Sequence, residues 1–232
     1  MSRVRIAVWC AVVLVVGACA VLAQRHEPPA PGSPGRAQIE QLLAQVQVVP
    51  DRRHVAGYER GCKSGEGCVF GQAWSDDNDG PLGHDGCDTR NNVLARQLTD
   101  VAFRPGTHDC VVVAGTLADP YGGKTLTFTK SAAGDVQIDH VYPLAAAWDM
   151  GASTWPLERR IRFANDVDFN LLAVSGPLNQ AKSDATPARW LPPAPAYRCY
   201  YAGKYLSVAA QYQLPVTAAD RDTLTDIATS CG

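Results

Sequence analysis

The sequence lacks three features that would assign it to a common class at once. No internal repeat is visible, which excludes solenoid and propeller architectures. No helix-turn-helix or similar recognition module is evident. A basic excess is also absent, because 21 Lys and Arg face 23 Asp and Glu, for a formal net charge of −2. Proteins that hold nucleic acid by bulk electrostatics usually carry a basic balance, so this chain would need a local basic groove instead.

The N-terminal residues have the pattern of an export signal. Arg3 and Arg5 precede an apolar run over residues 6–18, and this run is shorter than the roughly 20 residues of a membrane-spanning helix. We predict a signal peptide over residues 1–23, with cleavage after Ala23 and a secreted product. The alternative is a lipobox over residues 16–19, which would make Cys19 a lipid-modified membrane anchor, although hydrophobic residues after such a cysteine are unusual. A retained anchor is a third possibility.

The segment after the signal divides into a linker and one domain. Residues 24–35 are rich in Pro, Gly and Ala and carry almost no large apolar side chain, so they predict a linker. Residues 36–232 are long enough for a single domain with its own core. Loss of Arg3 and Arg5 with the signal removes two positive charges and no acid, which moves the net charge from −2 to −4.

The cysteines of the mature chain predict a disulfide-braced domain. Of 8 cysteines, Cys10 and Cys19 fall in the signal. The other six, in an exported chain, imply disulfides, for which sequence alone allows 15 pairings. A zinc site is the rival interpretation, but no CxxC pair exists and the environment is oxidising. The preferred pairing is Cys62 with Cys68, Cys87 with Cys110, and Cys199 with Cys231.

Hydrophobic periodicity and turn residues predict an α+β fold. Residues 51–86 have the composition of loops. Asp88 is a candidate helix cap, and Thr217 followed by Asp220 is a start signal for the last helix. Helices are predicted at 37–49, 90–98, 144–150, 157–164, from 176, 197–212 and 217–229, and strands at 110–117, 125–129, 135–140 and 169–174.

Asp139 and His140 are the strongest candidates for chemistry. A histidine with an unperturbed pKa near 6.5 suits proton abstraction from water at neutral pH. Asp139 is a hard oxygen ligand, and adjacent residues on a strand point to opposite faces. The order Asp–His can therefore place the carboxylate on a metal ion while the imidazole faces an attacking water. On its own, an Asp–His pair at this position more often caps the end of a strand than takes part in catalysis.

Two asparagines and a lysine complete the predicted constellation. Asn179 offers an amide oxygen to the same metal from a helix. A site with only two protein ligands suits Mg²⁺, because this ion keeps several of its bound waters. Lys182 shares that helix face and is a candidate for phosphate contact, or is simply solvated. Asn170 is expected to hydrogen-bond near His140 and fix its ring, or to satisfy its own turn backbone. Arg90 and Arg189 are candidates for substrate contact, and a salt bridge to Asp88 or Asp100 is the alternative for Arg90.

These segments resemble the HNH, or ββα-metal, endonucleases. The match runs through residues 138–144, then Asn170-Leu171-Leu172, then residues 179–184, and is closest to the branch with Asn and a following Lys in place of the last His. Residues 86–96, 110–121, 190–193 and 197–199 look like the exported actinobacterial members of the DUF1524, GmrSD C-terminal-like family. The resemblance covers roughly residues 70–232, with a core at about 110–190.

The resemblance implies a fold and a set of roles. It implies an HNH core with a long helical insertion, residues 145–168, and flanking helices. His140 would be the general base, Asp139 and Asn179 the metal ligands, and Asn170 the residue that holds the His loop. We therefore expect an exported, monomeric endonuclease that uses Mg²⁺, or Mn²⁺ or another divalent cation. Its expected substrate is DNA, with RNA as the alternative, and its expected sequence specificity is low. The alternative is a non-catalytic envelope or partner-binding module that retains the fold.

Overall fold

The computed structural model describes residues 27–232. The predicted signal peptide, its cleavage after Ala23 and lipid attachment at Cys19 all lie outside the described residues. Within residues 27–232, no helix combines the length and apolar character needed to cross a membrane. The end of the predicted linker packs on the domain, because Ala30 is buried and its N–H donates to the carbonyl of Ala196 at 2.8 Å.

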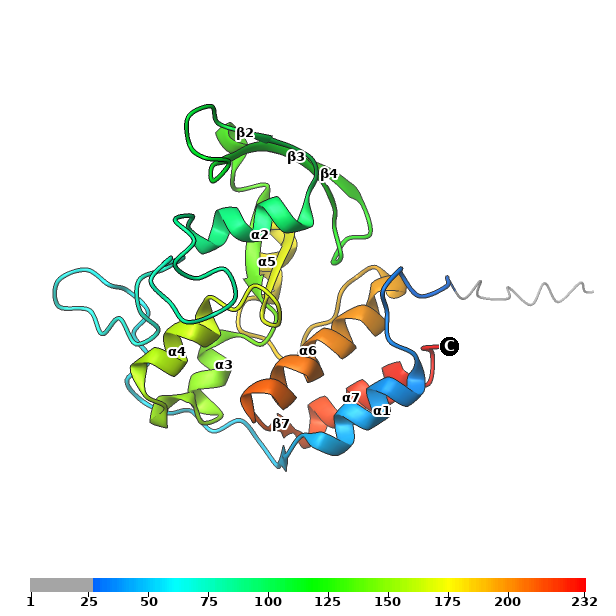
Figure 1. The fold of residues 1–232 in the computed structure, drawn as a ribbon. Helices are drawn as coiled ribbons and strands as arrows, with labels where there is room; N and C mark the ends of the chain where they lie inside the picture. Colours follow the sequence, from blue (N-terminus) through cyan, green and yellow to red (C-terminus); the bar gives the residue numbers. More distant parts are fainter. Residues whose placement is uncertain (1–26) are drawn as a thin grey trace, which may run out of the picture.

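The described residues form a mixture of helices and short strands (Figure 1), in agreement with the predicted α+β class. The sheets of the described residues are small, with two or three strands each. The helices are α1 (Arg36–Gln45), α2 (Thr89–Gln97), α3 (Leu144–Asp149), α4 (Leu157–Ala164), α5 (Gly176–Lys182), α6 (Arg198–Tyr212) and α7 (Ala218–Ala228), and the strands are β1 (Val48–Val49), β2 (Thr99–Phe103), β3 (Val112–Ala118), β4 (Thr125–Thr129), β5 (Val136–His140), β6 (Leu171–Ser175) and β7 (Val216–Thr217).

Local capping chemistry starts two of the helices where the sequence predicted. The carboxylate of Asp88 accepts from the N–H of Asn91 at 2.8 Å and begins α2. Thr217 and Asp220 form a reciprocal capping box at the start of α7, in which the threonine hydroxyl accepts from the N–H of Asp220 at 3.0 Å. Each cap satisfies a backbone donor that has no partner inside its helix.

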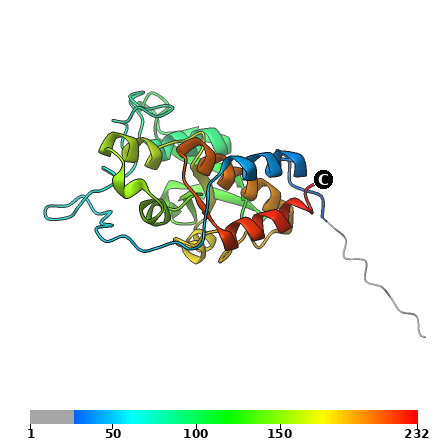
Figure 2. The same cartoon turned by 90° about the horizontal axis from the view of Figure 1, so that it is seen from below.

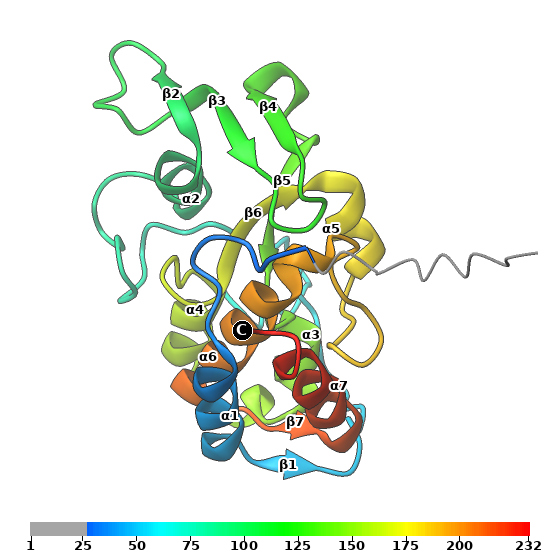
Figure 3. The same ribbon diagram turned by 90° about the vertical axis from the view of Figure 1, so that its right-hand side faces the viewer.

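The strands form three separate sheets. Strands β2, β3 and β4 make an antiparallel sheet, β1 and β7 pair in parallel, and β5 and β6 pair antiparallel. The β5–β6 pair lies between the three-stranded sheet and the helices (Figure 3). Helix α5 follows β6 directly and contacts both strands of the pair. This strand–strand–helix unit therefore occupies the middle of the molecule.

Two hydrophobic clusters meet at the β5–β6 pair. Leu171 and Ala173 of β6 belong to the smaller cluster, under α2 and the three-stranded sheet. Leu172 and Val174 point to the opposite face and join the larger cluster, which includes α3, α4, α6 and α7. Since β6 is buried on both faces, its sequence is a continuous apolar run and does not alternate between apolar and polar residues. Strand β5, which carries the candidate site, is thus paired with a strand whose residues 171–174 are all buried.

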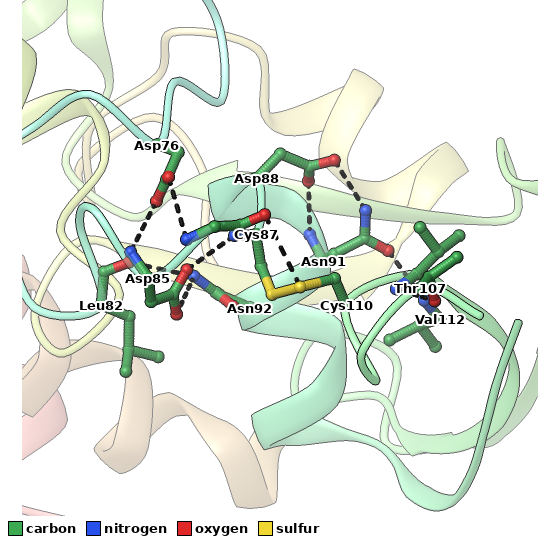
Figure 4. The surroundings of a disulfide bond; sticks show 12 residues. Asp76, Leu82, Asp85, Cys87, Asp88, Asn91, Asn92, Thr107, Cys110 and Val112 are labelled. Carbon is green, nitrogen blue, oxygen red and sulfur yellow. Dashed lines mark hydrogen bonds between the residues drawn. A yellow bond between two sulfur atoms is a disulfide. The ribbon is translucent and has the colours of Figure 1, made fainter. Parts of the chain in front are cut away.

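Three disulfides brace the part of the chain that the structure describes, and all three match the preferred pairing. Cys62–Cys68, Cys87–Cys110 and Cys199–Cys231 have Cα–Cα distances of 4.4, 5.1 and 5.8 Å. Figure 4 shows that Cys87–Cys110 joins the loop before α2 to the segment before β3, beside the Asn91 amide that accepts from the N–H of Val112. Cys199–Cys231 joins the start of α6 to the C-terminus.

Replacing Cys199 and Cys231 together with Ala is expected to lower the free energy of unfolding by about 2–5 kcal/mol. This disulfide closes a separation of 32 residues, whereas Cys62–Cys68 closes 6. A longer closed loop restricts the unfolded chain more, so removing Cys62–Cys68 should cost about 1.5 kcal/mol less. Urea unfolding of both double variants measures the difference, and an equal or larger loss for the short loop would contradict the entropic account.

Candidate active site

Strand β5 presents Asp139 and His140 in succession at its C-terminal end. They pair in register with Leu172 and Leu171 of β6, both buried. The two side chains have separate surroundings, as expected for neighbours on a strand. Asp139 contacts groups from α5 and from the turn after β3, while His140 contacts groups from α4 and from the loop before α2.

Asp139 is a buried carboxylate with two partners. The hydroxyl of Tyr121 donates to its Oδ2 at 2.5 Å, and the ammonium of Lys182 lies 2.9 Å from the same oxygen and 3.1 Å from Oδ1. Burial raises the pKa of Asp139, while the Lys182 charge and the Tyr121 hydroxyl act in the opposite direction. Only 5% of the residue is exposed, yet it lines a cavity of about 570 Å³.

The ring of His140 is held in one tautomer. Its Nε2 lies 2.9 Å from the carbonyl oxygen of Ala164, and the ring stacks on Trp74 with centroids 5.7 Å apart. A carbonyl can only accept, so Nε2 carries the proton and Nδ1 is the basic nitrogen. Burial, together with the positive charge of Arg60, lowers the pKa of His140 to about 3. The imidazole is therefore neutral at physiological pH.

Asn170 fixes the backbone just after His140 rather than the His140 ring. Its side-chain oxygen accepts from the N–H of Tyr142 at 2.9 Å, and its carbonyl accepts from the N–H of Val141. The amide nitrogen donates to the carbonyl of Phe163 at 3.4 Å. Asn170 is fully buried, so these bonds satisfy it and join β5 to the end of α4. The sequence predicted that Asn170 would fix the His140 ring. In the structure the carbonyl of Ala164 contacts the ring instead, and Asn170 bonds to the backbone.

Asn179 and Lys182 lie on α5 but face different surroundings. The amide nitrogen of Asn179 donates to Gln137 at 3.0 Å, and no partner of its side-chain oxygen is found among the described residues. Lys182 is buried, with its side chain 0% exposed, and also donates to the carbonyl of His140 at 3.0 Å. The ammonium group of Lys182 is therefore shielded both from solvent and from a substrate phosphate. The sequence had suggested either a phosphate contact or a solvated side chain, and the structure shows neither.

A cavity of about 570 Å³ opens beside these residues. Its walls come from β5, α3, α5 and an upstream segment of the chain. The lining combines hard oxygen donors with several charged groups, and His140 contributes to it directly. The residues of the lining are Arg52, His54, Tyr58, Arg60, Gln137, Ile138, Asp139, His140, Pro143, Leu144, Ala145, Asp149, Asn179, Gln180, Ser183 and Asp184.

The donor set of the cavity fits a hard divalent cation. Asp139 supplies a carboxylate, and Asn179 supplies an amide oxygen with no partner among the described residues. One or two protein oxygens completed by water and substrate are typical of Mg²⁺ sites. Residues 27–232 contain no group of three or more His, Cys, Asp or Glu side chains suited to holding an ion. Asp139 and Asn179 both line the cavity, and their role as metal ligands stays a prediction.

Comparison with known proteins identifies the family. The family model described as the C-terminal domain of GmrSD restriction endonucleases matches residues 88–227. The chain belongs to this family. It is also similar to an uncharacterized secreted protein of Arthroderma benhamiae, with 40% identity over 146 residues that cover 62% of this chain and 68% of that protein. No solved structure matches. The expected placement in an actinobacterial subset stays a prediction.

The two arginines predicted to contact substrate lie within the matched GmrSD domain but outside the cavity lining. Arg90 donates from its guanidinium to the carbonyls of Ala133 and Val136 at 3.1 and 3.0 Å, and burial lowers its pKa. It thereby holds the start of β5, and no salt bridge to an acid is found for it in the described chain. Arg189 is exposed in a neighbouring cavity of about 490 Å³.

Sequence reasoning missed several residues that shape the site. Tyr121 lies in the stretch 110–121 that carries the family resemblance but has no predicted role, and Trp74 lies in the segment 51–86 with the composition of loops. Arg52 and Arg60 lie in the same loop-like region, upstream of the residues that the GmrSD family model matches. No local pattern marks such residues, because their role depends on contacts with distant elements. The aspartate two residues before Tyr121 was the one usable signal, since it marks a turn directly after a strand.

Proposed function

We propose that this protein is an exported, metal-dependent endonuclease that hydrolyses phosphodiester bonds in DNA, with RNA as the alternative substrate, and with little sequence preference. The observation that carries the proposal is the tautomer of His140 in a cavity that also contains Asp139 and Asn179. A neutral imidazole with a free basic nitrogen beside hard oxygen donors suits hydrolysis of a phosphodiester. Membership of a restriction-endonuclease family and similarity to a secreted protein support the same conclusion.

In the proposed mechanism, each residue has a separate task. His140 Nδ1 takes the proton from the attacking water, while the Ala164 carbonyl keeps the ring oriented through Nε2–H. Asn170 holds the backbone at Val141 and Tyr142, so that the end of β5 keeps its position. Asp139 and Asn179 would hold the divalent cation, which supplies stabilisation of the charge that develops on the phosphate oxygens.

A non-catalytic binding module remains the alternative, and one observation favours it. The carboxylate of Asp139 already has Lys182 and Tyr121 as partners. A satisfied buried carboxylate is weaker as a metal ligand than a free one, because binding must compete with the existing ion pair. The alternative predicts normal folding, binding of a partner and no hydrolysis.

Metal removal separates the two functions. Purified protein lacking residues 1–23 is incubated with plasmid DNA, and in parallel with RNA, in Mg²⁺, in Mn²⁺ and in excess EDTA. We expect cleavage with metal and loss of cleavage to background in EDTA, restored when metal is added back. A well-folded protein that cleaves neither DNA nor RNA with any of several divalent metals would exclude the nuclease.

A further inference from the structure

One wall of the cavity comes from outside the matched family domain. Residues 50–61, here called the upstream segment, run from β1 past α3 to the loop closed by Cys62–Cys68 (Figures 1 and 2). Helix α3 holds this segment in place. The indole N–H of Trp148 donates to the carbonyl of Val55 at 3.2 Å, and the carboxylate of Asp149 accepts from the N–H of Val55 at 2.8 Å.

The cations of this wall differ in their partners. Arg52 lies between two carboxylates, 2.7 Å from Asp149 and 2.9 Å from Asp184. His54 lies 3.5 Å from Asp149. Arg60 is exposed and lines the cavity, and among the described residues it has neither an ion pair nor a side-chain hydrogen bond. Arg60 is therefore the cation of the wall whose charge remains available to a ligand.

The backbone on both sides of Arg60 is fixed. The carbonyl of Glu59 accepts from the N–H of Val69 at 3.1 Å, and the carbonyl of Gly61 accepts from the N–H of Cys68 at 2.9 Å. The Cys62–Cys68 disulfide closes the loop directly after these bonds. The main chain at Arg60 is thus held by these flanking hydrogen bonds beside a disulfide-closed loop. This reduces the conformational entropy that the main chain would lose on binding a ligand.

Arg60 is also close to His140. Both residues line the cavity of about 570 Å³, and both line a small cavity of about 20 Å³ beside Trp74. A group that must take a proton from water near a phosphate is thus accompanied by a cation that could hold that phosphate.

We propose that Arg60 binds a phosphate of the substrate beside His140, as a substrate contact supplied from outside the matched domain. The planar guanidinium can donate two parallel hydrogen bonds to phosphate oxygens. It replaces Lys182, which the sequence had suggested for this task and which is buried against Asp139. The substrate class is a phosphodiester anion, and this inference rests on the proposed nuclease function.

Two measurements on four proteins test this role. The wild type, Arg60→Gln, Arg60→Lys and the control Arg53→Gln are compared, because Arg53 is exposed on the same segment but absent from the cavity lining. The first measurement is equilibrium binding of a fluorescent DNA oligonucleotide in EDTA at several salt concentrations. The second is kcat/KM for cleavage of the same oligonucleotide in Mg²⁺ or Mn²⁺.

Arg60→Gln is expected to weaken binding and to lower kcat/KM by roughly 10- to 100-fold, as for loss of a hydrogen bond to a charged group. The slope of log affinity against log salt should decrease by about one. Arg60→Lys keeps the charge without the planar fork, so its loss should be intermediate. Arg53→Gln should match the wild type in both measurements.

The outcomes distinguish this inference from the proposed function. Wild-type cleavage with unchanged binding, salt slope and kcat/KM in Arg60→Gln overturns the role of Arg60 and leaves the nuclease intact. Wild-type binding without cleavage, weakened by Arg60→Gln, overturns the nuclease and supports Arg60 as a phosphate contact. A wild type that neither binds nor cleaves overturns both.

Discussion

Replacing His140 with Gln is expected to lower the rate of DNA cleavage by about 10²–10⁴-fold, the usual contribution of a positioned general base. Gln can still donate to the carbonyl of Ala164 and fill part of the space beside Trp74, so the surroundings of the ring are largely kept. It has no basic nitrogen in place of Nδ1, and water would have to lose its proton unassisted. The measurement is the single-turnover cleavage rate at saturating Mg²⁺ or Mn²⁺.

A matched variant shows whether the loss belongs to this histidine. His108 is exposed, with a backbone φ of 51°, a conformation that Asn tolerates well. His108→Asn should therefore keep the wild-type rate and stability. Thermal unfolding of both variants confirms that the protein is folded. If His140→Gln cleaves at the wild-type rate while EDTA still abolishes cleavage, another group must activate the water.

Local signals in the sequence predicted the elements that local chemistry specifies. Strand β4 spans Thr125–Thr129 as its alternation indicated, and α4 spans Leu157–Ala164 as its periodicity indicated. Caps at Asp88 and Thr217 began their helices as expected. Strand β2 was missed, because it is mostly exposed and its pairing with β3 contains register shifts. The two-residue pair of β1 and β7 joins distant parts of the chain, and no local pattern encodes it.

The site shows the same division between local and tertiary information. The helical spacing of Asn179 and Lys182 predicted a shared face, but tertiary packing gives the two side chains different surroundings. Lys182 is the last residue of α5, and it is buried because Asp139 lies within reach as an ionic partner. Burial of a charge depends on such a partner. A single sequence records the charge but not where the fold places its partner.

Replacing Lys182 with Met is expected to lower the free energy of unfolding by about 3–5 kcal/mol, the usual effect of removing one partner from a buried ion pair. Met keeps much of the packing volume but leaves Asp139 buried with only the Tyr121 hydroxyl as a partner. The carbonyl of His140 also loses a donor. Urea unfolding in EDTA measures the effect without a contribution from bound metal.

A double variant separates the ion pair from packing. Lys182→Met combined with Asp139→Asn removes both charges, so it should be more stable than Lys182→Met alone, with a coupling free energy of about 1–3 kcal/mol. Arg189→Met removes an exposed cation nearby and should change stability by no more than about 0.5 kcal/mol. If Lys182→Met is as mild as Arg189→Met, Lys182 is not buried against Asp139 in solution. Lys182 would then be available for the phosphate contact that its helical position first suggested, and Arg60 would no longer replace it in that task.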